Sequence, residues 1–117
     1  MIKSPSFLFA AAVLLATISP AAAGAANIAE QKAVGEVIYQ RAFGRGCGAC
    51  HDIASNPQLV ELISAGKLPL DKFTKVIKEG KNGMPKGIAV IMGVGPVKKA
   101  NLTEQQAISD LYLYLKR

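Results

Sequence analysis

Two stretches in the first half of the chain have the hydrophobic spacing of helices. From Asn27 to Phe43, apolar side chains recur about every 3.6 residues until Gly44-Arg45-Gly46 interrupts them. Gly35 lies inside this predicted helix, where glycine costs about 1 kcal/mol relative to alanine, so it indicates a close crossing with another helix. A second, shorter helix is expected from Pro57 to Ala65, with Gly66 as its stop.

The second half of the chain predicts two more helices. Asp71 is placed to cap a helix that runs to Glu79 and ends at Gly80. The last helix begins at Thr103, because Thr103 and Gln106 match the T-x-x-Q capping box. The apolar residues on their inner faces are Leu70, Phe73, Val76 and Ile77 in the first of these helices and Ile108, Leu111 and Leu115 in the second.

One apolar, glycine-rich stretch, Gly87–Val97, has no assigned structure or role. Its glycines and Pro96 argue against a stable strand. No other segment alternates convincingly between apolar and polar residues, so the pattern predicts an all-α fold. The length of 117 residues supports one small domain and excludes a multidomain enzyme.

The first residues have the composition of an export signal. Lys3 is followed by the nearly pure apolar run Phe7–Ile18, which Pro20 breaks. Ala21-Ala22-Ala23 then offers small residues in front of a cleavage point. We therefore expect a signal peptide at residues 1–23 and a periplasmic domain at residues 24–117.

The competing interpretation of this start is an uncleaved membrane anchor. The run Phe7–Ile18 is shorter than the roughly 20 residues that a spanning helix needs. Cleavage is therefore favoured, and no stable membrane span is expected after it. The compartment outside the cytoplasm is oxidising, so the two cysteines of the chain should be bonded to something.

The motif Cys47-Gly48-Ala49-Cys50-His51 is the strongest chemical signal in the sequence. C-x-x-C-H is the attachment signature of c-type haem. Two thiols at this spacing can bond to two substituents on one edge of the porphyrin, and the following imidazole is then placed as an axial ligand to the iron. The sequence therefore predicts one covalent haem c held by Cys47, Cys50 and His51.

Three other interpretations of this motif compete with haem attachment. A thioredoxin-like redox pair needs a βαβ context that the pattern does not contain. A zinc site needs a second C-x-x-C or a pair of histidines, and His51 is the one histidine of the chain. A strained local disulfide between Cys47 and Cys50 would leave His51 unexplained. Haem attachment accounts for all three residues.

The residues alone leave the sixth iron ligand open. A second histidine ligand from this chain is excluded, because His51 is the only histidine. The remaining possibilities are a methionine, a lysine or no ligand. After removal of the signal peptide, the methionines are Met84 and Met92.

The chain resembles the class I monohaem cytochromes c over most of residues 27–117. The resemblance depends on CGACH, Asn56-Pro57-Gln58-Leu59, the stretch from Gly80 to Pro85 (GKNGMP) and the terminal helix. It implies a small bundle of three to five short helices wrapped around the haem. It also implies that the carbonyl of Pro57 accepts the imidazole N–H, that Met84 is the sixth ligand, and that the first and last helices cross near the haem edge.

Positive charge is concentrated in residues 67–99. The net charge of the chain is +6, and this segment has eight lysines against Asp71 and Glu79. The lysines are Lys67, Lys72, Lys75, Lys78, Lys81, Lys86, Lys98 and Lys99. They form either a solvated face or a surface that steers an acidic redox partner. Nucleic acid is not expected as a partner, since the chain is predicted to be exported and has few arginines.

These observations predict a soluble extracytoplasmic one-electron carrier, with no enzymatic activity of its own. Its partners would be redox proteins with acidic docking surfaces, such as a dehydrogenase or an oxidase. One alternative is a cytochrome subunit of a periplasmic dehydrogenase complex, with the apolar stretch Gly87–Val97 as the interface. Another is a five-coordinate haem that acts as a gas sensor or peroxidase, which requires that Met84 does not bind iron.

Overall fold

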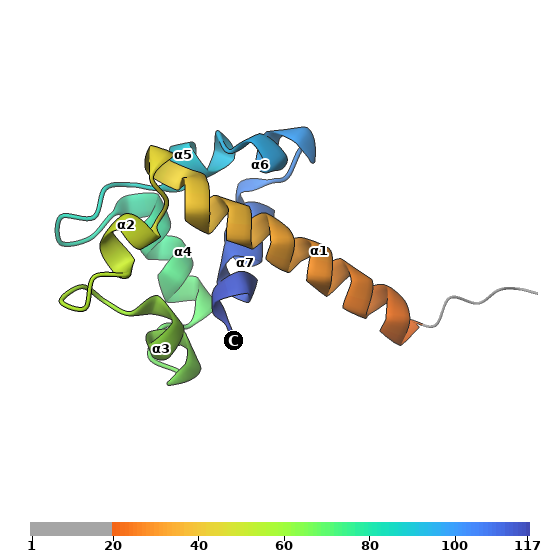
Figure 1. The fold of residues 1–117 in the computed structure, drawn as a ribbon, viewed down its shortest axis with the longest axis horizontal. Coiled ribbons are helices and arrows are strands. Elements are labelled where there is room, and N and C mark those ends of the chain that lie inside the picture. Colours follow the sequence, from red (N-terminus) through yellow and green to blue (C-terminus); the bar gives the residue numbers. More distant parts are fainter. Residues whose placement is uncertain (1–19) are drawn as a thin grey trace, which may run out of the picture.

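The computed structural model describes residues 20–117, and in this range the fold is all-α (Figure 1). The helices are α1 (Pro20–Arg41), α2 (Gly48–His51), α3 (Leu59–Ser64), α4 (Leu70–Glu79), α5 (Ile88–Met92), α6 (Gly95–Lys99) and α7 (Glu104–Leu115), and a 3-10 turn η1 (Ala42–Gly44) follows α1. The all-α prediction is confirmed. The expected number of three to five helices is too low, since the described residues form seven α-helices.

The N-terminal predictions fall largely outside these residues. The predicted signal peptide at residues 1–23 lies outside the described range except for positions 20–23, which begin α1. That helix therefore starts earlier than the Asn27 expected from the pattern. From residue 20 onward, no helix has both the length and the apolar character needed to cross a bilayer.

Helices α1 and α7 cross closely and form the centre of the core (Figure 1). A Cβ atom on Gly35 would overlap the backbone oxygen of Asp110 and would lie 2.7 Å from the Cβ of Tyr114. Ile38 from α1 and Ile108 from α7 are both fully buried in this region. The close helix crossing that Gly35 predicted is therefore confirmed, because only a residue without a side chain fits between the two backbones.

Helix α4 packs on α7 through the apolar face that the pattern predicted. Phe73 and Ile77 are buried, and the Phe73 ring meets the Tyr112 ring edge-on with their centroids 5.2 Å apart. The expected cap at Asp71 is wrong: the residue before the helix is Pro69, and Asp71 lies in the first turn. A carboxylate there still interacts favourably with the positive end of the helix dipole.

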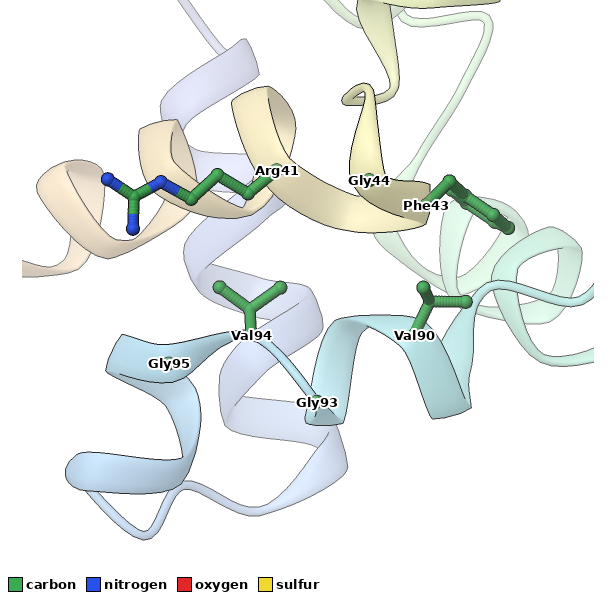
Figure 2. Close-up of a pocket in the computed structure, with 7 residues that line it drawn as sticks. All are labelled: Arg41, Phe43, Gly44, Val90, Gly93, Val94 and Gly95. Carbon is green, nitrogen blue, oxygen red and sulfur yellow. The ribbon is translucent and has the colours of Figure 1, made fainter.

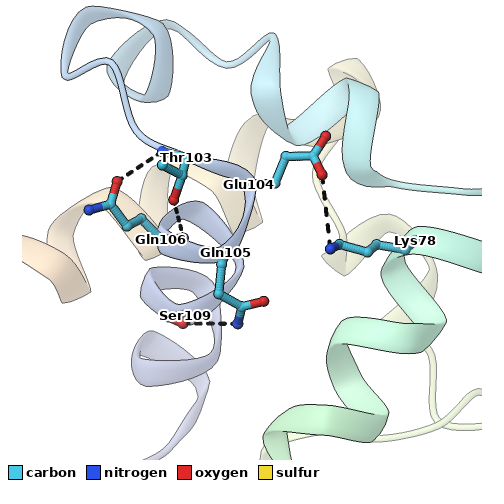
Figure 3. Close-up of polar contacts among 6 residues, drawn as sticks. All are labelled: Lys78, Thr103, Glu104, Gln105, Gln106 and Ser109. Atoms are coloured by element: carbon cyan, nitrogen blue, oxygen red, sulfur yellow. Dashed lines mark hydrogen bonds and ion pairs between the residues drawn. The ribbon is translucent and has the colours of Figure 1, made fainter.

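The start of α7 is the capping box that the sequence predicted (Figure 3). The Gln106 backbone N–H donates to Thr103 Oγ1 at 3.1 Å, and the Thr103 backbone N–H donates to Gln106 Oε1 at 2.8 Å. Nearby, Lys78 Nζ lies 3.9 Å from Glu104 Oε1 and joins α4 to α7. The two cap bonds satisfy backbone donors that a helix start otherwise leaves without an intrahelical partner.

The unassigned stretch Gly87–Val97 folds as α5 and most of α6. Pro96 lies in the first turn of α6, where its missing N–H costs no helical hydrogen bond. Ile91, Val94 and Val97 are buried at a spacing of three residues, and they anchor the segment on the core. The segment thus contributes to the fold, with Gly87 buried and with Gly93 and Gly95 exposed.

Candidate functional site

The CGACH motif forms the single helical turn α2, with Cys47 as its N-cap, shortly after α1 and η1. The Cys47 N–H donates to the Tyr39 carbonyl at 2.7 Å, and the His51 N–H donates to the Cys47 carbonyl at 3.0 Å. Gly46, which lies between η1 and Cys47, has a φ of +89°. A Cβ atom there would lie 2.5 Å from the backbone oxygen of Tyr39. Glycine at this position therefore permits the reversal that folds the motif back against the end of α1.

His51 is oriented by the loop that follows it. Its Nδ1 lies 2.9 Å from the backbone oxygen of Pro57. A carbonyl oxygen accepts but cannot donate, so Nδ1 must hold a proton in this contact. In the neutral ring, Nε2 is then the nitrogen with a free lone pair, which is the form in which a histidine binds a metal.

Two side-chain amides hold this loop in place. Gln58 Nε2 lies within hydrogen-bond distance of three backbone oxygens, those of His51 at 3.1 Å, Ile53 at 2.8 Å and Asn56 at 3.0 Å. Asn56 Nδ2 donates to the Cys50 oxygen at 2.8 Å. The resemblance included these residues as part of a motif, but their positioning contacts were not predicted. Amide side chains on both sides of a proline, Asn56 before it and Gln58 after it, are the sequence signal that could have indicated them.

Cys47 and Cys50 are both free thiols with different environments. Cys47 is half-buried against the core, whereas Cys50 is exposed. Burial is the main cause that raises the pKa of the Cys47 thiol to about 11, and the Asp52 carboxylate contributes further. Reactive C-x-x-C pairs have a lowered thiol pKa, so this environment is unlike that of a thioredoxin-type site.

Tyr39 and Asp52 connect the motif to the helix crossing. The Tyr39 hydroxyl donates to Asp52 Oδ1 at 2.7 Å, and burial together with this bond raises the Tyr39 pKa above its usual range. A Cβ on Gly48 would overlap the Asp52 carboxylate. The Tyr39 ring also packs against Tyr114 of α7 with centroids 5.8 Å apart. The motif turn is therefore fixed to both α1 and α7.

Met84 lies in a tight turn between α4 and α5. Lys81 and Met84 exchange two backbone hydrogen bonds of 3.1 and 2.9 Å. Gly80, just before the turn, and Gly83, within it, have φ angles of +79° and +89°. The Met84 side chain is half-buried against the core, and so is that of Met92 on α5. In Figure 1, this turn and α2 both lie at the end of the molecule opposite the start of α1.

Apolar side chains in the motif and in the segments that follow it are only partly covered. Cys47, Leu59, Met84 and Ile88 contact the buried core yet keep part of their surface exposed. Two cavities of about 390 and 470 Å³ lie elsewhere, and neither is lined by the CGACH residues, Pro57 or Met84. Among the described residues, no group of three or more His, Cys, Asp and Glu side chains is arranged to hold a metal ion. The fit to a haem is therefore one of donor atoms and partly covered apolar surface.

The structure thus brings Cys47, Cys50, His51 and Pro57 together in one loop and places Met84 on a separate turn. No protein-family model, no curated protein and no solved structure matches this chain. The likeness to the class I cytochromes c depends on the motifs quoted above.

The eight lysines of residues 67–99 are all exposed. Lys72, Lys75 and Lys78 lie on the outer face of α4, opposite Phe73 and Ile77. Lys81 and Lys86 flank Met84. Positive charge therefore covers the surface on both sides of the turn that carries the proposed methionine ligand.

Proposed function

We propose that this protein is an exported one-electron carrier with a single haem c. Cys47 and Cys50 would attach the haem, and His51 and Met84 would bind its iron. The bound haem would supply a reversible one-electron couple at iron. The chain itself would hold the ligands in fixed positions and keep water from part of the haem surface.

The single observation that supports this proposal best is the hydrogen bond between His51 and Pro57. A histidine that binds a metal almost always donates its other ring N–H to a carbonyl or carboxylate, which fixes the tautomer and the ring orientation. The 2.9 Å contact from Nδ1 to the Pro57 oxygen is of this kind. Two free thiols stand within the same helical turn, so all three donor atoms of the attachment signature belong to one ordered unit.

Covalent attachment is tested by replacing both thiols. The full-length chain should be produced in a host that exports it and attaches haem c, and the purified protein should keep its haem through acid-acetone extraction. Cys47→Ala/Cys50→Ala should lose all extraction-resistant haem and much of its folded structure, since a domain of this size loses a central apolar body. Ser55→Ala, a change at an exposed loop position, is the matched control and should keep the haem. A well-folded wild-type protein that contains no covalent haem would overturn the proposal.

The identity of the sixth ligand is tested by two methionine variants. Met84→Ala should lose the near-infrared band of methionine-bound ferric haem, lower the potential and admit exogenous ligands. Met92→Ala should keep that band and cost only stability, because Met92 packs from a helix against the core. The opposite pattern would transfer the assignment to Met92. If both variants keep the band, neither Met84 nor Met92 is the ligand.

Export and partner choice belong to the same proposal. Mass spectrometry of protein from the periplasmic fraction should find an N-terminus at Gly24. The exposed lysines would steer an acidic redox protein to the haem-bearing end, so electron transfer should slow as ionic strength rises. Lys81→Glu/Lys86→Glu should lower the second-order rate about tenfold or more, whereas the Tm should barely change because both side chains are exposed.

A further inference from the structure

A shallow apolar groove of about 390 Å³ lies between the end of α1 and the segment α5–α6 (Figure 2). Val90 and Val94 rise from α5–α6 toward α1, and Phe43 and Arg41 extend in opposite directions along the other side. Five of the lining residues are exposed, namely Arg41, Phe43, Gly44, Gly93 and Gly95. The groove is therefore open to solvent along most of its lining.

Gly93 and Gly95 keep this groove open, although neither position requires glycine for its backbone conformation or for lack of space. A Cβ on Gly95 would meet nothing within 4 Å, and a Cβ on Gly93 would make ordinary contacts at 3.5 Å. Gly93 has a φ of −85°, and neither residue has a positive φ. Neither backbone conformation nor crowding requires glycine at these positions. The absence of side chains there leaves room for a group that approaches the groove from solvent.

Phe43 contributes an aromatic ring from a strained position. Its φ is +63°, a conformation uncommon for a bulky residue, and its side chain is 39% exposed. The Gly46 N–H donates to the Ala42 carbonyl at 2.8 Å and closes the turn around it. Strain of this kind persists where the surrounding structure holds it, and such positions concentrate at functional sites.

The two chain segments that supply the lining of the groove contain only basic charged residues. Residues 41–51 contain Arg41 and Arg45 and no acidic residue, and residues 80–103 contain four lysines and no acidic residue. All six of these basic side chains are exposed. An acidic surface is therefore the complementary one.

The exposure of the groove favours a protein over a small molecule. Small-molecule sites usually bury 70–90% of their ligand, whereas most of this lining faces solvent. An open apolar strip with a basic rim suits one apolar anchor on a larger, charged partner, because anchors of this kind supply much of the affinity of an interface.

We propose that this groove docks an acidic protein partner, which inserts one apolar side chain between Phe43, Val90 and Val94 and places a carboxylate at Arg41. The inference rests on the proposed function only for the redox role of that partner. Cys47 follows Phe43 by four positions in the sequence, so a partner seated here lies close to the attachment motif.

The test is a titration of the ¹⁵N-labelled full chain followed by NMR. The probe is a short capped peptide of Asp and Glu with one central Leu. It should give saturable shifts at the amides of Gly44, Gly93 and Gly95. A peptide with Ser in place of the central Leu should bind about tenfold more weakly, since one buried apolar side chain is lost. A peptide with Lys in place of the acidic residues should not bind.

Paired variants locate the contact. Gly95→Leu fills the groove and should weaken binding of the Leu peptide about tenfold, while Ala89→Leu adds the same side chain at an exposed position outside the groove and should leave it unchanged. Arg41→Gln should weaken binding several-fold, with Lys67→Gln, on the connection between α3 and α4, as its control. If Gly95→Leu perturbs the fold, Val90→Ala removes one wall of the groove and should weaken binding in its place.

Three results would overturn the inference. Equal affinity for the Leu and Ser peptides would reduce the contact to charge alone. Binding of octanoate as tight as that of the Leu peptide would make the groove a small-molecule site. Full binding by both Gly95→Leu and Arg41→Gln would place the contact elsewhere. The peptide titration is made on the purified wild-type chain whether or not it contains haem, so a folded protein without covalent haem that still binds would fail only the proposed function.

Discussion

The crossing of α1 and α7 and the loop from Cys47 to Gln58 are held by different interactions. At the crossing, Ile38 and Ile108 are fully buried and the two backbones meet at Gly35. In the loop, the conformation is held by partly buried side chains that donate to backbone oxygens, such as Gln58 and Asn56. Burial of apolar surface stabilises the whole domain, whereas hydrogen bonds near water contribute little net free energy and mainly select a conformation.

This difference separates stability from site geometry. A change at the crossing should alter the free energy of unfolding and affect the loop only through global unfolding. A change of the amide side chains that hold the loop, Asn56 and Gln58, should alter the orientation of the His51 ring while the domain stays folded. The four predictions below test this division, beginning with the largest expected effect.

Gly35→Ala should have the largest effect. The new methyl group would overlap the Asp110 backbone oxygen, and overpacking of this kind should lower the free energy of unfolding by about 3 kcal/mol, despite the better helix propensity of alanine. Urea unfolding followed by circular dichroism measures the loss. Gly95→Ala is the matched control and should be close to neutral, because a Cβ there meets nothing. A neutral Gly35→Ala would refute the close crossing.

Asp110 predicts a pH dependence that belongs to the crossing. Its side chain is only 5% exposed, and burial raises the pKa of its carboxyl to about 6. The native state then holds a proton that the unfolded state has lost between about pH 4 and pH 6, so this group's contribution to stability falls as the pH rises through that window. Above pH 6 the loss is complete.

Asp110→Asn should remove this pH dependence and raise the free energy of unfolding at pH 7 by about 2 kcal/mol. Denaturant titrations of wild type and variant at pH 4 and pH 7 measure both effects. Asp71→Asn, at an exposed position on α4, is the control. If wild type and Asp110→Asn keep the same difference in stability at both pH values, burial does not control this carboxyl.

Gln58→Ala tests the loop. The variant loses a donor to three backbone oxygens, and we expect a cost of about 1 kcal/mol because these oxygens can still bind water. The larger consequence should be at His51, whose Nδ1–H signal should exchange faster in NMR spectra. Gln105→Ala removes a long exposed contact to Ser109 and should change neither property. A large loss of stability without a change at His51 would contradict the separation of domain stability from the geometry of the loop.

The smallest effect is expected for Lys78→Gln. The Lys78–Glu104 pair is 3.9 Å apart, and both side chains are well exposed. Exposed pairs contribute about 0–1 kcal/mol, and we expect about 0.5 kcal/mol or less here. Thermal unfolding at low and high salt measures the difference between variant and wild type. A loss of more than 1 kcal/mol would mean that α4 and α7 depend on this ion pair.

Much of the fold was predictable because its signals are local. The capping box of Thr103 and Gln106 and the stop at Gly80 each depend on residues within one helical turn of one another. The apolar spacing of α4 and α7 predicted which side chains are buried, Phe73 and Ile108 among them. The start of α3 was less accurate, since Pro57 and Gln58 are used by the loop and the helix begins at Leu59.

The segment from Gly87 to Val97 could not be predicted in this way. Each of its helices, α5 and α6, is only five residues long, and isolated helices of this length are not stable in water. They form because Ile91, Val94 and Val97 are buried against the rest of the core. A pattern search limited to the segment itself cannot contain that information.

The sequence by itself determined the α-helical class, the glycine at the main crossing and the residue types of the attachment motif, because each depends on the chemistry of a few neighbouring residues. Only the tertiary structure decided that Gln58 closes the loop behind His51, that Asp110 is buried, and that α5–α6 leaves a groove beside Phe43. The burial of Asp110 and the groove arise where segments distant in the sequence pack together, and the Gln58 contacts arise where the loop folds back on its own backbone. Their energies depend on which surfaces lose contact with water, and that is settled only when the chain is folded.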